Sequence, residues 1–198
     1  MSKGFQTDGL SGLLRKEIFE QDIHALVPLD RRVRIRRDEQ SGKDRRGERS
    51  LSLCYLDGDN FKSINDEEGH DTGDHVISEL GRIIRESIKP SDRAYRLGGD
   101  EFAVVALDLP DVMMYGTRLA KAVKEHEFKY KGKIIPMTIS VGIATHIPMD
   151  GYVDAEELKE EADNLCYESK GYRKQNHGKG RVTILIPKTK EIIQSGEI

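Results

Sequence analysis

Two acidic stretches of the sequence carry residue types that bind metal ions. Asp57 and Asp59 follow the apolar run SLSLCYL, and Asp100 and Glu101 follow two glycines in RLGGDEF. Carboxylate oxygens are the ligands that Mg²⁺ prefers, and an ion that keeps open positions can also take phosphate oxygens. The expected chemistry is metal-assisted reaction of a phosphate compound, provided that the fold brings the two stretches together.

The stretch at residues 57–68, DGDNFKSINDEE, has nearly the acidic spacing of a calcium loop between two helices. Such a loop needs glycine at its sixth position and usually an oxygen ligand at its fifth, where this sequence has Lys62 and Phe61. The residues before Asp57 are also strand-like rather than helical. The sequence therefore argues against a calcium loop and leaves acidic residues at the end of a buried strand, where α/β proteins place ligand sites.

The elements that must position these residues follow from the apolar periodicity. Apolar side chains recur at helical spacing from Leu10 to Leu26, and the run at 50–56 predicts a buried strand. The further elements expected are a helix at 76–88, a hairpin around GGDE at 98–101, a helix at about 110–125, two strands joined by a Lys-Gly turn at 128–145, a helix at 154–172 and a strand at 181–186.

This order of elements predicts an α+β fold, because strand, helix, strand, hairpin, strand, helix and strand follow one another as in ferredoxin-like split βαβ folds. The sheet should be rich in antiparallel pairs and flanked by helices. In such a sheet a hairpin strand lies beside the first strand, which would bring Asp100 near Asp57. Taken alone, the glycine-rich hairpin tip could equally be a solvated turn, so the prediction of a metal site rests on both stretches.

Length and composition limit the classes of protein to consider. At 198 residues the chain predicts a single domain over 1–198. A formal charge of -3 favours neither nucleic acid nor an acidic membrane as partner. No apolar run approaches a membrane span and the start MSKGFQTDGL lacks a secretory core, so we expect no membrane contact and a cytoplasmic location. The two cysteines, Cys54 and Cys166, should be buried free thiols.

An arginine-rich segment at 28–50 separates the first helix from the first buried strand and has no periodic apolar face. A connection of this length is uncommon unless it is disordered or functional. The sequence predicts a flexible loop, with a binding role as the alternative.

Several motifs together resemble the GGDEF family of diguanylate cyclases. They are GGDEF at 98–102, LDGDNFKSINDEEGHDTGD at 56–74, DGLSGL at 8–13, TISVGIA at 138–144 and the AD...Y...K pattern at 162–170. The resemblance implies the palm-like fold of nucleotidyl cyclases. It also implies that the protein condenses two GTP molecules into cyclic di-GMP and releases two pyrophosphates.

The resemblance also implies a metal site and a base. Asp57, the carbonyl of Gly58 and Asp100 would hold Mg²⁺, with Mn²⁺ as an alternative ion. Either Asp100 or Glu101 would act as the base, and the sequence does not choose between them. The ion would bind phosphate oxygens and help lower the pKa of the attacking ribose hydroxyl.

The substrate-binding residues implied by the resemblance fall into three groups. Asn65 and Asp74 would read guanine, because a carboxylate can accept both N–H donors of that base and adenine has no such pair. This favours GTP over ATP and cyclic di-GMP over a mixed cyclic dinucleotide. The other residues so implied are Phe61, Lys62 and His70 beside the substrate, and Lys170 and Lys174 on the terminal phosphates.

The resemblance further implies a homodimer, because each domain holds one GTP and ring closure needs two opposed attacks across a two-fold axis. A sensory or receptor protein is a further expected partner. Two departures from the family pattern stand out: KPSD at 89–92 in place of Arg-x-x-Asp predicts weak or absent product inhibition, and RKQN at 173–176 stands where G-R-N is common. The alternative function is a catalytically weak module that binds GTP or cyclic di-GMP and signals through a partner.

Overall fold

Strand β2 (Leu51–Gly58) lies in the middle of the sheet, as its nearly continuous apolar sequence requires. It pairs antiparallel with β4 (Glu101–Leu107) on one side and with β7 (Ile139–His146) on the other. Six of its eight residues are buried, and Tyr55 and Asp57 are partly exposed. The strand therefore delivers Asp57 to the edge of the core and not to its centre.

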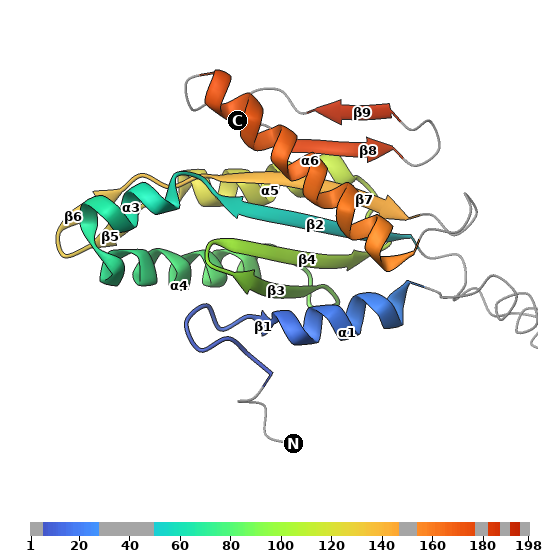
Figure 1. Cartoon of the computed structure of the whole chain (residues 1–198), viewed down its shortest axis with the longest axis horizontal. Helices are drawn as coiled ribbons and strands as arrows, with labels where there is room; N and C mark the ends of the chain where they lie inside the picture. The colour runs from blue at the N-terminus through green and yellow to red at the C-terminus, as the bar shows by residue number, and fades with distance from the viewer. Residues whose placement is uncertain (1–5, 28–49, 147–153, 177–181, 187–190, 195–198) are drawn as a thin grey trace, which may run out of the picture.

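The computed structural model describes residues 6–27, 50–146, 154–176, 182–186 and 191–194 (Figure 1). Within them one sheet has the strand order β1-β3-β4-β2-β7-β8-β9, and a separate hairpin pairs β5 with β6. The strands not yet located are β1 (Leu14–Arg15), β3 (Arg93–Gly98), β5 (Phe128–Tyr130), β6 (Lys133–Ile135), β8 (Val182–Ile186) and β9 (Glu191–Gln194). The inner order β3-β4-β2-β7, with every neighbouring pair antiparallel, is the predicted split βαβ arrangement.

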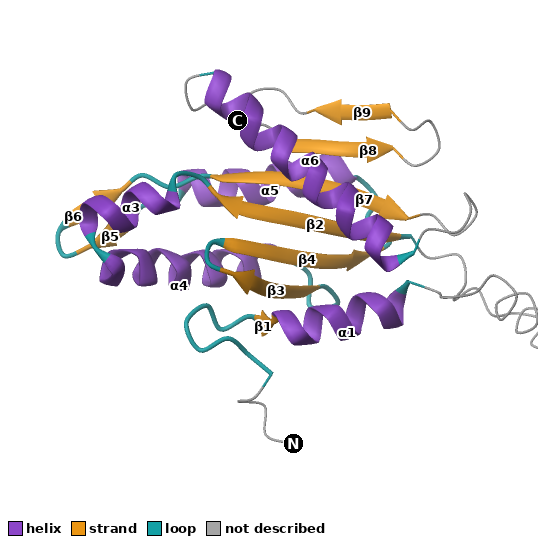
Figure 2. Ribbon diagram, in the orientation of Figure 1, coloured by secondary structure: helices purple, strands orange, loops and turns teal. Residues whose placement is uncertain are grey.

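Helices cover both faces of this sheet (Figure 2). On one face α4 (His70–Ser87) and α5 (Val112–Glu125) pack against the β2 residues Cys54 and Leu56. On the other face α1 (Lys16–Leu26) and α6 (Ala155–Gln175) pack against Leu51 and Leu53. The α+β fold predicted from the sequence is thus confirmed, with a three-layer arrangement of helices, sheet and helices.

Several elements differ from the sequence-based expectation. The first helix begins at Lys16 and not near Leu10, because residues 8–13 form a turn and Leu14–Arg15 pair as a parallel strand with β3. The strand expected to run through 133–145 is broken into β6 and β7 around Pro136, which has no N–H to donate to a ladder. A short helix, α3 (Phe61–Glu68), and the final strand β9 were not predicted.

The structure confirms that Cys54 and Cys166 are buried free thiols. Burial raises the pKa of both thiols, so neither is poised to react as a thiolate. No helix among the described residues is long and apolar enough to cross a membrane. The predicted arginine-rich loop lies outside the described residues except at its last position, Ser50.

Candidate active site at the ends of β2 and β4

The fold brings the two acidic stretches together, as the sequence predicted. Asp57 is the register partner of Glu101 in the β2–β4 ladder, and the backbone N–H of Gly58 donates to the carbonyl of Asp100 at 3.0 Å. A methyl group at Gly58 would lie only 3.1 Å from Oδ2 of Asp100. Glycine at this position thus lets the Asp100 side chain and Met137 pack closely against the end of β2.

The carboxylates of Asp57 and Asp100 together carry more negative charge than the Lys170 ammonium neutralises. Burial, and then the charge of Asp57, raise the pKa of Asp100 above its usual range. The ammonium of Lys170 lies 2.5 Å from Oδ1 of Asp57. Burial alone would lower the pKa of Lys170, but the contact with Asp57 and the charge of Asp100 raise it. Two carboxylates and a backbone carbonyl with this excess of negative charge suit a small divalent cation.

Asp59 lies on the same face of the chain but is not open to a ligand. Its Oδ2 accepts from Thr138 Oγ1 at 2.6 Å and its Oδ1 accepts from Ser140 Oγ at 2.7 Å. The Nε of Arg173 lies 3.2 Å from Oδ2, which is an ion-pair distance. The buried Asp59 carboxylate therefore fixes the end of β2 against β7 and α6, a role that its spacing from Asp57 did not reveal.

The hairpin that carries Asp100 is held from the N-terminal turn. Gly99 has φ +51, which favours glycine, and its carbonyl accepts two hydrogen bonds from Arg96, at 3.0 and 2.8 Å. Arg96 also donates to Oδ1 of Asp8 at 3.0 Å, and the same oxygen accepts from the backbone and hydroxyl of Ser11. The turn at residues 8–13 thus positions the hairpin tip through Arg96.

We predict that replacing Asp8 with asparagine destabilises the protein in a pH-dependent way. Burial raises the pKa of Asp8, but the bonds from Ser11 and Arg96 outweigh it, and the net pKa lies below the ordinary value of 3.8. The carboxylate therefore stabilises the fold fully above that value and loses its contribution as the pH falls through the lower folded-state pKa. Urea unfolding should give a loss of about 1 kcal/mol at pH 7 that shrinks as the pH is lowered below 3.8. A pH-independent loss would contradict the prediction.

The predicted guanine-reading residues meet where α3 and α4 pack together. The side chain of Asn65 lies over Gly73, because a methyl group there would fall 1.9 Å from Asn65 Oδ1 and 3.2 Å from the ring of Phe61. Asp74 follows Gly73 and is exposed. Gly73 therefore lets the Asn65 amide lie against α4, next to the Phe61 ring and close in sequence to the exposed Asp74.

The remaining predicted residues lie nearby with different exposure. Lys62 is exposed in the first turn of α3, and His70 is exposed at the start of α4. Lys174 is exposed one turn after Lys170 on α6. The structure places Lys170 beside Asp57, and among the described residues it records no contact that assigns a role to the other three. The positioning residues Asp8, Arg96 and Arg173 were missed by the sequence analysis, because only their partners in space reveal what they do.

A family model described as diguanylate cyclase, GGDEF domain, matches residues 29–176. The chain belongs to this GGDEF family. The diguanylate cyclase DgcS of Shewanella oneidensis is 32% identical over 171 residues, which are 86% of this chain and 51% of DgcS. The probable diguanylate cyclase DgcE of Escherichia coli is 35% identical over 138 residues, 69% of this chain and 12% of DgcE. The chain thus spans about half of one relative and a small part of the other.

Solved GGDEF domains share the fold. The GGDEF domain of DgcB from Caulobacter crescentus, solved in complex with cyclic di-GMP, gives a TM-score of 0.70 at 26% identity and covers 93% of this chain and 98% of that domain. The family also occurs within proteins of a different name: the cyclic di-GMP phosphodiesterase PdeB of Shewanella oneidensis is 29% identical over 97% of this chain and 20% of PdeB. Family membership alone therefore does not decide the activity, and the site residues must.

In the KPSD segment of this GGDEF domain, hydrogen bonds within the protein engage the Asp92 carboxylate. Asp92 is buried, and its Oδ2 accepts from the hydroxyl of Tyr115 at 2.9 Å and from the backbone of Lys89 at 3.1 Å. Its Oδ1 accepts from Ser91 at 3.3 Å. Both carboxylate oxygens have partners within the protein, and the weak or absent product inhibition expected from this segment stays a prediction.

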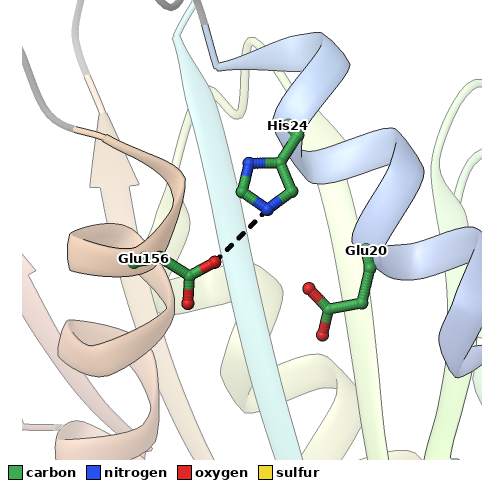
Figure 3. A group of neighbouring side chains, drawn as sticks. All are labelled: Glu20, His24 and Glu156. Atoms are coloured by element: carbon green, nitrogen blue, oxygen red, sulfur yellow. Dashed lines mark ion pairs between the residues drawn. The ribbon is translucent and has the colours of Figure 1, made fainter.

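A second cluster of metal-binding side chain types lies between α1 and α6, away from the acidic hairpin (Figure 3). Among the described residues, Glu20, His24 and Glu156 bring ligand atoms within 4.8 Å of one another. However, the ammonium of Lys159 lies 2.7 Å from Glu20 and 3.1 Å from both oxygens of Glu156. Because Lys159 already supplies positive charge to both carboxylates, we interpret the cluster as an ion-pair network that joins the two helices.

Proposed function

We propose that the protein is a diguanylate cyclase that condenses two GTP molecules into cyclic di-GMP and two pyrophosphates, with Mg²⁺, as a homodimer. The observation that carries this proposal is the juxtaposition of Asp57, the Gly58 backbone and Asp100 beside the Lys170 ammonium. These groups can hold a divalent cation and a phosphate chain together. The intact hairpin, with Glu101 opposite Asp57, favours turnover over binding alone.

In this mechanism Asp57, Asp100 and the Gly58 carbonyl would hold Mg²⁺, which supplies charge neutralisation at the phosphates when bound. Mn²⁺ would suit the same oxygen ligands. Lys170, which contacts Asp57 in this structure, would turn toward the phosphates once a divalent ion neutralises that carboxylate. Lys62, exposed in the uncapped first turn of α3, would add a further positive charge beside the same phosphates, and His70 would border the nucleotide.

The proton of the attacking ribose hydroxyl needs an acceptor at the hairpin. Asp100, whose pKa is raised by burial and by the charge of Asp57, would be such an acceptor while it is free of metal. Once Asp100 is a metal ligand that role passes to Glu101, which is exposed beside it. Asn65 and Asp74 would hold guanine where α3 and α4 pack together and would orient the nucleotide.

The reaction requires two such sites to face each other, because each 3′-hydroxyl attacks the α-phosphorus of the nucleotide on the partner protomer. The hairpin tip with Gly98 and Gly99 presents no side chain beyond the backbone, which leaves room for a second nucleotide. A homodimer with a two-fold axis near the hairpins would meet this requirement.

The proposal is tested by incubating the purified protein with GTP and Mg²⁺ over a range of protein concentrations and identifying the products by mass. Cyclic di-GMP whose rate of formation rises faster than linearly with protein concentration is expected for a dimeric cyclase. ATP added in competition should neither be incorporated nor inhibit strongly. Tight GTP binding without product, even after fusion to a dimerising coiled coil, would favour the binding module that signals through a sensory or receptor partner.

A glycine substitution tests the guanine site separately. Gly73→Ala should weaken GTP binding by about tenfold or more, because the added methyl occupies the place of Asn65 Oδ1. The unfolding free energy should change little, since alanine is also the better helix former. Ser78→Ala, at an exposed position on the same helix, is the matched control. Unchanged GTP affinity in Gly73→Ala would exclude the region around Asn65, where α3 and α4 pack together, as the guanine site.

A further inference from the structure

The β5–β6 hairpin reaches from the core to the junction of α3 and α4 (Figure 1). At its base, Phe128 pairs with Ile135, and both side chains are buried in the core that α4 and α5 share with the sheet. At its tip, Lys131 and Gly132 have φ values of +48 and +82, the geometry of a tight two-residue turn. The hairpin is therefore anchored at one end and has a defined shape at the other.

The tip of the hairpin contacts the first two turns of α4. The ring of Tyr130 stacks on the ring of His75, with centroids 4.9 Å apart and an interplanar angle of 25°. The ammonium of Lys131 lies 5.0 Å from the centroid of the Tyr130 ring and 3.5 Å from Oδ2 of Asp71. Asp71 and His75 are four residues apart and so lie on one face of α4. The hairpin thus holds this face through a partly buried stack and an exposed ion pair.

A further contact of the hairpin reaches the end of α3. The ammonium of Lys133 lies 2.5 Å from Oε2 of Glu68, the last residue of α3. Gly69 follows with φ +88, and its carbonyl accepts from the N–H groups of Thr72 and Gly73 at the start of α4. The hairpin therefore contacts both sides of the turn that joins α3 to α4.

These contacts fix the rotation of α4 about its own axis. Successive helical residues are turned by about 100°, so Gly73, Asp74 and His75 point in three different directions. Gly73 faces α3, because Asn65 lies over it, and His75 faces the hairpin. Asp74 comes between them in the helical turn and is exposed. Its direction is therefore set from both sides, by α3 at Gly73 and by the hairpin at His75.

We propose that the β5–β6 hairpin is a positioning element for base recognition, in which Tyr130 holds α4 through His75 so that Asp74 and Asn65 face the same guanine. This inference rests on the proposed function for the identity of the base. Exposed ion pairs contribute little, so the stack should carry most of the effect. A ring pair of this kind corresponds to about a threefold to tenfold factor in an equilibrium constant. Tyr130 acts through α4 and not on the reacting atoms.

The test begins with hydrogen exchange of the ligand-free protein. The amides of Gly69 and Gly73 both donate hydrogen bonds within the α3–α4 turn. Tyr130→Ala should speed their exchange by about threefold to tenfold, because the turn opens more often once the stack is lost. Tyr130→Phe keeps the ring and should keep wild-type rates. Lys129→Ala, at an exposed position in the same hairpin, is the control.

A second measurement reads the base. Calorimetry with Mg²⁺ compares guanosine and adenosine 5′-(α,β-methylene)triphosphate, neither of which can release pyrophosphate. Tyr130→Ala should weaken the guanosine analogue about threefold to tenfold and change the adenosine analogue less than twofold, so that the preference for guanine falls. Tyr130→Phe should keep the wild-type affinities. In the cyclase assay, the KM for GTP should rise in Tyr130→Ala while kcat stays unchanged.

Other outcomes overturn the inference. Unchanged exchange at Gly69 and Gly73 would show that the hairpin does not hold the turn. Faster exchange with unchanged guanosine affinity would show that the turn does not position the base-reading pair, and equal weakening of both analogues would mean a loss that is not specific to the base. A wild-type protein that does not bind the guanosine analogue would exclude both the inference and the proposed function.

The two proposals can also fail separately, because exchange and binding are read without turnover. Faster exchange and weaker guanosine binding in Tyr130→Ala, in a protein that makes no cyclic di-GMP, would leave this inference standing while the proposed function fails. Cyclic di-GMP formation with exchange and affinity independent of Tyr130 would do the reverse.

Discussion

Asp100→Ala is expected to lower the rate of cyclic di-GMP formation by at least about a thousandfold. The change removes one of the two carboxylates that would hold the divalent ion, and loss of about 4 kcal/mol of charge stabilisation in the transition state corresponds to that factor. The rate is to be measured as product formed per protomer at saturating GTP and Mg²⁺. Glu125→Ala, which removes an exposed carboxylate from α5, should retain full activity.

The same substitution should not damage the fold, which separates a chemical effect from misfolding. Burial and the charge of Asp57 raise the pKa of Asp100, so its ionised form is disfavoured in the folded state and costs stability at neutral pH. The cost is absent below the ordinary pKa of 3.8 and appears as the pH rises through the higher folded-state value. Metal-free Asp100→Ala should therefore unfold at or above the wild-type temperature at pH 7, while stabilisation by Mg²⁺ with GTP should disappear. Undiminished activity in this variant would rule out the proposed site.

Lys170 stabilises the site electrostatically when no metal ion is bound. An isolated pair of carboxylates at the ends of β2 and β4 would repel each other, and the ammonium 2.5 Å from Asp57 offsets part of that repulsion. A divalent ion held by Asp57 and Asp100 would do the same more strongly and would leave the lysine without its partner. The divalent ion would therefore free Lys170 to bind phosphate. We expect the ion to bind before Lys170 contacts the phosphates.

The core of this site was predictable because it depends on local patterns. The apolar run before Asp57 and the glycines before Asp100 identify a strand end and a hairpin, and the split βαβ order then places them side by side. The family resemblance supplied the guanine-reading pair. The structure brings Asn65 over Gly73, the residue before Asp74, and the reading of guanine by this pair stays a prediction.

The supporting contacts were not predictable, because they join residues far apart in the chain. The sequence around Arg96 does not indicate that this side chain links the carbonyl of Gly99 to Asp8, 88 residues away. Asp59 resembled a second metal ligand, and only the hydroxyls of Thr138 and Ser140 show that its carboxylate is occupied. The helix start was misplaced for a related reason. Leucines at 10, 13 and 14 keep a helical spacing even though Asp8 and Ser11 form a competing turn.

The packing of α6 on β7 sets the positions of Lys170 and Arg173, and Gly142 controls that packing. A methyl group at Gly142 would fall 2.1 Å from the backbone nitrogen of Cys166 and 2.5 Å from the carbonyl of Ala162. Both are backbone atoms of α6, so the clash cannot be relieved by rotating a side chain. The helix must move away from the strand, and the Asp57–Lys170 contact must lengthen with it.

Gly142→Ala should therefore destabilise the protein by about 2 to 4 kcal/mol and lower its melting temperature by roughly 5 to 12 °C. Gly171→Ala is the matched control, because it adds the same methyl group within α6 where no atom lies within 4 Å. That variant should gain about 0.5 to 1 kcal/mol, since alanine replaces glycine inside a helix. Scanning calorimetry of the two variants measures both changes in melting temperature. Equal melting temperatures would mean that α6 does not rest directly on Gly142, and that the spacing of its cations from β2 is set elsewhere.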